Sequence, residues 1–239
     1  MISVFTDMLF PTKEEIEKEN CVDGLYNVYT LNIPKASIFF GSYNFLINDA
    51  IINYKNEVIV AKFYYACIVK YYEAYKKNKC ENYEFWLRKY IEQEIKELYS
   101  IYDKSMHIIN RLYNFNLRPD FHFKETIREK LKKVDKKKYR KINSVFSRLY
   151  GDDYKYILRD DITHNISSMF DKLNPVYNNG IVDSWKKENA ITIGKSLEII
   201  KEICSLLAEN INIINDMLKE KFSSKIASEQ KKENQNNSN

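Results

Sequence analysis

The chain contains few of the residues that interrupt secondary structure. Its 239 residues include only five glycines and four prolines. These two residue types together make up about 12% of an average protein. A β-sandwich or an α/β fold needs many turns, which glycine and proline commonly supply, so both fold classes are disfavoured. The sequence instead favours a small number of long helices.

Cysteine and histidine, which carry much of metal and nucleophilic chemistry, are also scarce. The four cysteines are Cys21, Cys67, Cys80 and Cys204. The closest two are thirteen residues apart, too far for a zinc knuckle, so we expect reduced thiols. The three histidines are His107, His122 and His164. Since no His-Glu-x-x-His pair, glycine-rich phosphate loop or Gly-x-Ser-x-Gly turn occurs, we expect no metal and no cofactor.

Targeting and membrane signals are not recognisable in the sequence. The first ten residues have no basic start and include Asp7, which is not typical of a signal peptide. The longest apolar stretch, residues 58–69, is interrupted by Lys62 and is too short to span a bilayer. We therefore expect a cytoplasmic protein with no membrane partner.

What the sequence does contain is a helical pattern of apolar residues, which recur at steps of three and four. Helices are predicted at residues 34–75, 83–114, 123–149, 154–170 and 186–222, with a break in the first near residues 53–56. No strand is predicted, and the segment with Pro175 and residues 178–180 is expected to be a loop. The fold class predicted is all-α, an up-and-down bundle of long antiparallel helices.

The same pattern divides the chain into three parts. Residues 1–33 are expected to be irregular, with one short helix that begins at Thr12, where Thr12 and Glu15 form a capping-box pattern. Residues 34–225 form the helical domain, and residues 226–239 are expected to be a disordered tail. The last helix carries two apolar stripes and would be about 50 Å long, which exceeds a compact domain of this size. We therefore expect a homodimer in which this helix crosses a neighbouring subunit.

Positive charge is concentrated in one segment. The formal net charge is +5, yet residues 124–141 hold ten basic and three acidic residues, so the rest of the chain is slightly acidic. Such a local patch suits an anionic partner such as RNA. The candidate phosphate-binding residues are Lys132, Lys133, Lys136, Lys137, Lys138, Arg140 and Lys141. The alternative is an ordinary solvated helix face in a lysine-rich chain.

A short motif near residue 160 combines the side chains that metal-independent RNA cleavage requires. His164 follows Arg159 by five positions on a predicted helix. Attack by the RNA 2′-hydroxyl needs a proton acceptor, a proton donor and a fixed positive charge on the phosphorane. Histidine titrates near neutrality and can move either proton, while arginine stays charged and binds phosphate. Two copies related by a two-fold axis would give a denser cluster. The alternative is that Arg159 pairs with a neighbouring aspartate and that His164 lies in the core.

The sequence Arg159-Asp160-x-x-x-His164-Asn165, on a helix between long helices, resembles the motif of the HEPN (higher eukaryotes and prokaryotes nucleotide-binding) family. The resemblance covers roughly residues 36–222. It implies an all-α protein that is commonly dimeric. The members of this family include metal-independent endoribonucleases of toxin–antitoxin and phage-defence systems. It also implies that His164 is the general acid or base and that Arg159 binds the phosphate. Asp160, Thr163 and Asn165 would be supporting residues.

Two functions therefore follow from the sequence. The first is a homodimeric HEPN-type ribonuclease that acts in phage defence or as a toxin, with RNA as substrate and an antitoxin or defence-system protein as a further partner. The second is a non-catalytic helical dimer that binds RNA, a nucleotide or a protein. Candidates for an acidic partner of the motif lie on the first long helix and are Asp49, Glu57 and Glu73. His107, His122 and the tyrosine pairs at 64–65 and 71–72 are expected to be mainly structural.

Overall fold

Three long helices dominate the structure, a computed structural model that describes residues 9–28, 43–151, 173–178, 181–187 and 192–236. The elements in chain order are α1 (Lys13–Lys18), α2 (Asp23–Tyr26), α3 (Tyr43–Lys77), α4 (Glu81–Leu112), α5 (Phe123–Val134), α6 (Lys136–Tyr150), β1 (Leu173–Asn178), β2 (Ile181–Lys187) and α8 (Ile193–Asn236). The described chain is thus mainly helical, as the apolar pattern predicts. Within these ranges no helix is apolar over a stretch long enough to cross a membrane.

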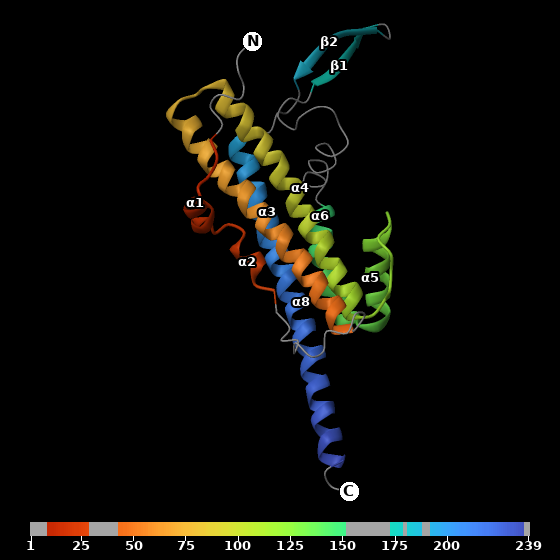
Figure 1. The fold of residues 1–239 in the computed structure, drawn as a ribbon. Helices are drawn as coiled ribbons and strands as arrows, with labels where there is room; N and C mark the ends of the chain where they lie inside the picture. Colours follow the sequence, from red (N-terminus) through yellow and green to blue (C-terminus); the bar gives the residue numbers. More distant parts are fainter. Residues whose placement is uncertain (1–8, 29–42, 152–172, 179–180, 188–191, 237–239) are drawn as a thin grey trace.

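The helices α3, α4 and α8 lie side by side, and α6 packs on α8 (Figure 1). Only three residues connect α3 to α4, and a connection that short makes neighbouring helices antiparallel. The core lies between these four helices, and its largest fully buried side chains include three tyrosines, Tyr54, Tyr71 and Tyr102. The hydroxyl of Tyr71 accepts a hydrogen bond from the backbone N–H of Leu9 at 2.8 Å.

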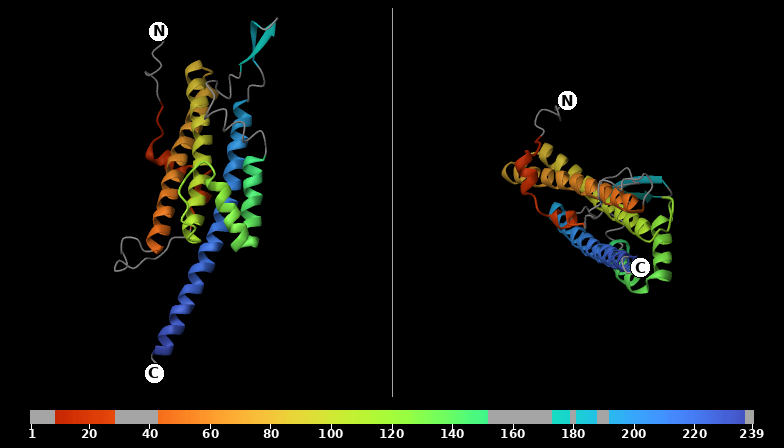
Figure 2. Two further views of the ribbon diagram at one scale, coloured as in Figure 1. Left: turned by 90° about the vertical axis from the view of Figure 1, so that its right-hand side faces the viewer. Right: turned by 60° about the horizontal axis from the view of Figure 1, so that its bottom comes forward.

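Both apolar stripes of α8 are buried within this one chain. The first includes Ile200 and Leu207, and the second includes Ile203 and Leu206. Since α8 contacts α4, α6 and α2, the wide apolar face is explained by packing inside the bundle. The C-terminal part of α8 extends beyond the other helices (Figures 1 and 2).

The predicted break in the first long helix is wrong, because α3 is continuous through residues 53–56. Tyr54 is buried there, and its hydroxyl donates a hydrogen bond to the Leu25 carbonyl oxygen at 3.0 Å. Asn53 and Asn56 lie on the exposed face of the same turn. The asparagines therefore do not interrupt the buried stripe.

The prediction of one helix over residues 123–149 is also wrong, because the helix is interrupted at Asp135. The backbone of Asp135 is non-helical, and its carboxylate accepts a hydrogen bond from the backbone N–H of Lys138 at 2.9 Å. This N-cap begins α6 and separates it from α5. The apolar period continues across the break, which hides it in the sequence.

The second long helix ends at Leu112, earlier than the predicted end at residue 114. Asn114 and Asn116 have positive φ angles of 53°, a conformation that asparagine tolerates better than most residues. The amide side chain of Asn110 then bonds both the N–H and the carbonyl oxygen of Leu117. These bonds hold the loop that leads to α5.

The largest correction concerns the predicted loop with Pro175 and residues 178–180, where β1 and β2 form an antiparallel hairpin. The register pairs Leu173 with Lys187 and Asn178 with Ile181, with an irregularity at Val176 and Tyr177. Residues 179 and 180, an Asn-Gly dipeptide typical of hairpin turns, stand between the strands in the sequence. Figure 1 shows the hairpin at the end of the molecule where α8 begins.

The last helix differs from its predicted bounds at both ends. It begins at Ile193 instead of Lys186, since β2 occupies residues 181–187. It continues to Asn236, through residues expected to be a disordered tail. That stretch contains two Lys, two Glu and two Gln residues, which favour helix when a preceding helix has already nucleated it.

The N-terminal segment confirms the capping box. The Thr12 hydroxyl accepts from the Glu15 N–H, and the Glu15 carboxylate accepts from the Thr12 N–H at 2.6 Å. A second short helix, α2, follows and packs against α3 and α8. The segment therefore covers one side of the bundle (Figure 2).

Candidate nucleic-acid interface

The Arg-x4-His motif lies outside the described residues. This holds for Arg159, Asp160, Thr163, His164 and Asn165, all within residues 152–172. Their geometry is therefore not tested. The structure does describe α6, which ends at Tyr150 and leads into this segment through Gly151.

The basic segment forms the end of α5, the turn at Asp135 and the first half of α6. We define the α5–α6 basic face by six exposed residues, Lys132, Lys133, Lys136, Lys137, Arg140 and Lys141. On α6 its members are spaced three and four residues apart, so they share one side of the helix. The opposite side is buried and includes Ile142, Val145 and Leu149.

Within the described part of the chain, the charges of this face are not neutralised by ion pairs. The ion pairs of α5 and α6 involve Lys124, Arg128, Lys138 and Arg148, none of which belongs to the face. The ammonium group of Lys132 lies 5.7 Å from the centre of the Tyr139 ring. The face therefore presents fixed positive charge to solvent, as the sequence predicts.

Lys138 is the exception among the predicted phosphate-binding residues. It is 6% exposed, and its ammonium group lies 2.7 Å from the carboxylate of Glu220 on α8. A lysine with this burial and this partner is not available to a phosphate. Adjacent residues of a helix point about 100° apart, so Lys138 can be buried although its neighbour Lys137 is exposed.

The start of α6 is electrostatically unfavourable without a partner. Its first turn contains Lys136, Lys137 and Lys138 and no acidic residue, where the helix dipole favours negative charge. The Asp135 cap supplies one carboxylate, which also accepts a hydrogen bond from the Tyr113 hydroxyl at 3.1 Å. A bound anion at this end would relieve the repulsion.

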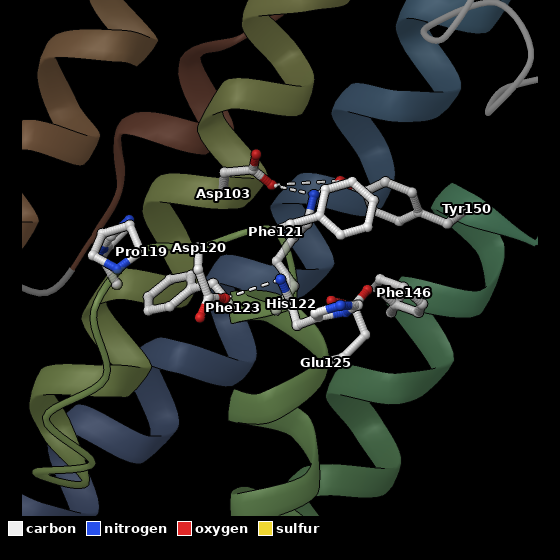
Figure 3. A pocket seen from close by; sticks show the side chains of 11 residues that line it. Asp103, Pro119, Asp120, Phe121, His122, Phe123, Glu125, Phe146 and Tyr150 are labelled. Carbon is white, nitrogen blue, oxygen red and sulfur yellow. Dashed lines mark hydrogen bonds and ion pairs between the residues drawn. The ribbon is translucent and has the colours of Figure 1, made fainter.

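A pocket of about 660 Å³ lies at the other end of α5 (Figure 3). It lies between α4, the loop at residues 119–122, the start of α5 and the end of α6. Its lining is rich in imidazole, aromatic and charged side chains. The lining residues in the described part of the chain are Asp103, His107, Pro119, Asp120, Phe121, His122, Phe123, Lys124, Glu125, Phe146 and Tyr150.

Two of the three histidines meet at this pocket, which sequence reasoning missed. The His107 ring lies 4.5 Å from the Phe123 ring, and burial, with Lys104 and Arg111 nearby, lowers the pKa of His107. His107 is therefore neutral at pH 7 and has a nitrogen able to accept a proton or a hydrogen bond. His122 is exposed at the rim, 5.1 Å from the Phe121 ring. The signal available in the sequence was the run Phe121-His122-Phe123.

The pocket also contains a positive group that is held in place. The ammonium group of Lys124 lies 3.0 Å from the Asp103 carboxylate and 3.1 Å from the Tyr150 hydroxyl. Tyr150 in turn stacks on Phe146, with ring centres 4.7 Å apart. The Arg128 guanidinium carbon lies 3.4 Å from the centre of the Phe146 ring. The result is an aromatic wall with cations placed against it.

Phe121 is the most exposed large apolar side chain described, at 91%. It stands at the mouth of the pocket (Figure 3). An aromatic ring in water beside an imidazole and a lysine is suited to stacking against a nucleobase. The pocket is thus able to hold a planar anion or a base with its phosphate.

The remaining candidates behave as structural residues or lie elsewhere. Tyr65 and Tyr71 are buried, and Tyr64 and Tyr72 are partly buried, as expected. The acidic residues at the pocket come from α4, the loop and α5, and none of Asp49, Glu57 and Glu73 lines it. Within the described ranges, no three His, Cys, Asp or Glu side chains are close enough to hold a metal ion.

Comparisons with known proteins add no relative: no family model, no curated protein and no solved structure matches the chain. The features that bear on function are therefore the sequence motif and the described surface.

Proposed function

We propose that the protein is a metal-independent endoribonuclease of HEPN type that binds RNA along the α5–α6 basic face. The observation that carries the proposal is this face of exposed cations, which has no ion-pair partners in the described chain. Phosphates are the natural partner of such a surface. The same helix, α6, leads within nine residues of its end to Arg159.

The proposed chemistry uses two residues of the motif. His164 moves a proton between the RNA 2′-hydroxyl, the leaving 5′-oxygen and water, while Arg159 binds the phosphate and stabilises the charge of the transition state. Asp160 orients Arg159, with Thr163 and Asn165 as neighbours. The long antiparallel pair α3 and α4 and the final helix α8 are consistent with the arrangement that the resemblance implies. We further propose a homodimer, in which the two motifs share one cleft, and a toxin or phage-defence role restrained by a partner protein.

A second function is favoured by the pocket itself. Among the described residues, its lining already combines two imidazoles, several aromatic rings and the Lys124 ammonium group. A protein that binds RNA or a nucleotide there, without cleaving it, would need neither Arg159 nor His164. Only the first function cleaves RNA, so one experiment can distinguish the two.

The experiment is digestion of a labelled single-stranded RNA in the presence of EDTA. Purified wild-type protein is compared with Arg159→Ala and His164→Ala, and binding of the same RNA is measured in parallel. Arg148→Ala is the matched control, because it removes one exposed guanidinium from the described surface, where Arg148 pairs with Glu209 at 2.6 Å.

The proposal expects each motif variant to lose about 10²-fold or more in cleavage rate, the usual scale for a lost acid–base or electrostatic group. Binding should change little, and Arg148→Ala should cleave like the wild type. Equal cleavage by all four proteins would reject the assigned residues. Binding without cleavage by any of them would instead support the second function.

A further inference from the structure

A second pocket lies on another side of the molecule, where the N-terminal segment meets α8. It has a volume of about 490 Å³ and opens to solvent. Two cysteines that are far apart in the sequence, Cys21 and Cys204, both line it, together with Glu19, Tyr65 and Lys201. Cys21 is half-buried and Cys204 is buried. Neither thiol contributes to the proposed RNA chemistry.

The backbone around the two cysteines is held close by packing. A Cβ atom added to Gly24, three residues after Cys21, would lie 3.9 Å from the Cβ of Ala208, four residues after Cys204. Further along, the amide of Asn215 donates to the carbonyl oxygen of Asn27 at 2.7 Å. Residues 21–27 therefore run beside residues 204–215 in a fixed register.

The same segment is also tied to α3. The Tyr54 hydroxyl donates to the Leu25 carbonyl oxygen at 3.0 Å, and Lys62 pairs with Asp23 at 2.6 Å. Behind Cys21, the Glu19 carboxylate accepts from the backbone N–H of Asn20 and of Cys21 at 2.9 and 3.0 Å. The backbone around Cys21 is thus held by contacts with α3 and by the Glu19 carboxylate.

The two thiols are chemically unequal. A hydrogen bond from the Cys204 thiol lowers the pKa of Cys21 to about 7. Tyr65 and Lys201 also lower this pKa, while burial and Glu19 raise it. The same contact with Cys21, together with burial and the nearby Glu94, raises the pKa of Cys204. Near pH 7 a large fraction of Cys21 is thiolate, while Cys204 keeps its proton. Burial raises the pKa of Cys67 to about 12, which makes that thiol unreactive.

We propose that Cys21 and Cys204 are an oxidation site for peroxides, with Cys21 as the attacking thiolate and Cys204 as the resolving thiol. The Cys21 thiolate attacks one oxygen of hydrogen peroxide, the O–O bond breaks, and the products are a sulfenic acid and hydroxide. The Cys204 sulfur then attacks the Cys21 sulfur, the S–O bond breaks, and water leaves with the Cys204 proton. Two thiols are oxidised to one disulfide while one peroxide is reduced to water.

The disulfide would fasten the N-terminal segment to α8. In the reduced protein this segment is held by the hydrogen bonds and packing described above, which local opening can break. A covalent link between residues 21 and 204 closes a long loop and restricts that opening. Oxidation would thus stabilise the cover on one side of the bundle.

The test uses the full chain, reduced and then treated with stoichiometric hydrogen peroxide at pH 7. Peptide mapping under non-reducing conditions should recover a peptide pair joined through Cys21 and Cys204, with the mass of two hydrogens lost. The same product should form in the double variant Cys67→Ser, Cys80→Ser. Recovery of Cys80-linked dimers in place of this pair would overturn the proposal.

A second variant separates the two roles. In Cys204→Ser the resolving thiol is absent, so a sulfenic-acid trap such as dimedone should label Cys21 but not Cys80. In Cys21→Ser neither trap adduct nor disulfide should form at Cys204. Iodoacetamide labelling of Cys21 in the wild type should follow its lowered pKa of about 7, and in Cys204→Ala the profile should shift to higher pH because the hydrogen bond from Cys204 is lost. A labelling profile that is unchanged, or labelling that favours Cys80, would reject the assignment even if the variants fold normally.

Discussion

The Lys138 ammonium group lies 2.7 Å from the Glu220 carboxylate and so links α6 to α8. The side chain of Lys138 is 7% exposed and that of Glu220 is 65% exposed. Lys137, the sequence neighbour of Lys138, is exposed and belongs to the α5–α6 basic face. One run of three lysines therefore supplies both a structural contact and a surface for an anion, and the two uses are separable by mutation.

Replacing Lys138 with alanine should lower stability and leave RNA binding nearly unchanged. Because the partner Glu220 is largely exposed, the loss should be modest, about 1 kcal/mol, which lowers Tm by about 2–4 °C in a chain of this size. Lys137→Ala is the matched control and should show the reverse pattern, with weaker binding and an unchanged Tm. Thermal unfolding and fluorescence anisotropy with a labelled RNA measure the two effects.

The basic face should account for the salt dependence of RNA binding. The quadruple variant Lys133→Ala, Lys136→Ala, Lys137→Ala and Lys141→Ala removes four phosphate-binding charges. For single-stranded RNA each lost phosphate contact lowers the slope of log affinity against log salt by about 0.7, so the slope should fall by about 3. Anisotropy titrations at several salt concentrations measure the slope.

A control with the same change in net charge tests whether position matters. Lys13, Lys18, Lys77 and Lys79 are exposed on α1 and at the turn between α3 and α4, away from α5 and α6. Their quadruple alanine variant should keep most of the wild-type slope. If both quadruple variants lose the same slope, binding reflects overall charge and the face is not a site.

The sequence was sufficient for most of the helical fold because buried residues recur with the helical period. It could not reveal the break at Asp135, since the apolar period of residues 123–149 continues across it. A single capping carboxylate decides that break. Low glycine content over the whole chain does not exclude a hairpin, because one Asn-Gly dipeptide is enough for a local turn.

The candidate site was only partly predictable. Exposed lysines were identified from charge density alone, but the burial of Lys138 depends on where Glu220 of α8 lies. The pocket joins His107 of α4 to His122 and to Tyr150 of α6, residues up to 43 positions apart, so no local pattern reveals it. The predicted motif at Arg159 and His164 remains a prediction.

Truncation of two phenylalanines at the pocket should have different effects, on RNA affinity for Phe121 and on stability for Phe123. Phe121 is 91% exposed, so Phe121→Ala should change stability by less than about 0.5 kcal/mol. If its ring stacks on a base, RNA affinity should fall about 5-fold or more. Phe123 is 6% exposed and packs on His107, so Phe123→Ala should cost about 3–5 kcal/mol in unfolding free energy. Unchanged RNA affinity in Phe121→Ala would remove the pocket from the binding surface.

Glu94 should make stability depend on pH in a direction opposite to that of a paired carboxylate. Its side chain is fully buried on α4, and neither carboxyl oxygen has a hydrogen-bond partner among the residues that the structure describes. Burial, with Cys21, Glu97 and Glu19 nearby, raises the pKa of Glu94 well above its usual range. The folded protein therefore keeps a proton that the unfolded chain releases above about pH 4.5.

Because the folded state binds more protons in that window, the free energy of unfolding should fall as pH rises from about 4.5 through the folded pKa. The slope contributed by one such group is at most about 1.4 kcal/mol per pH unit. Glu94→Gln cannot titrate, so its stability relative to wild type should increase over this range, as urea unfolding at pH 4 to 8 will measure. Glu73→Gln, at an exposed position of α3, controls for the added amide. Parallel curves for Glu94→Gln and wild type would mean that the buried carboxyl has found a partner, since only an unpaired acid is forced to stay protonated by burial.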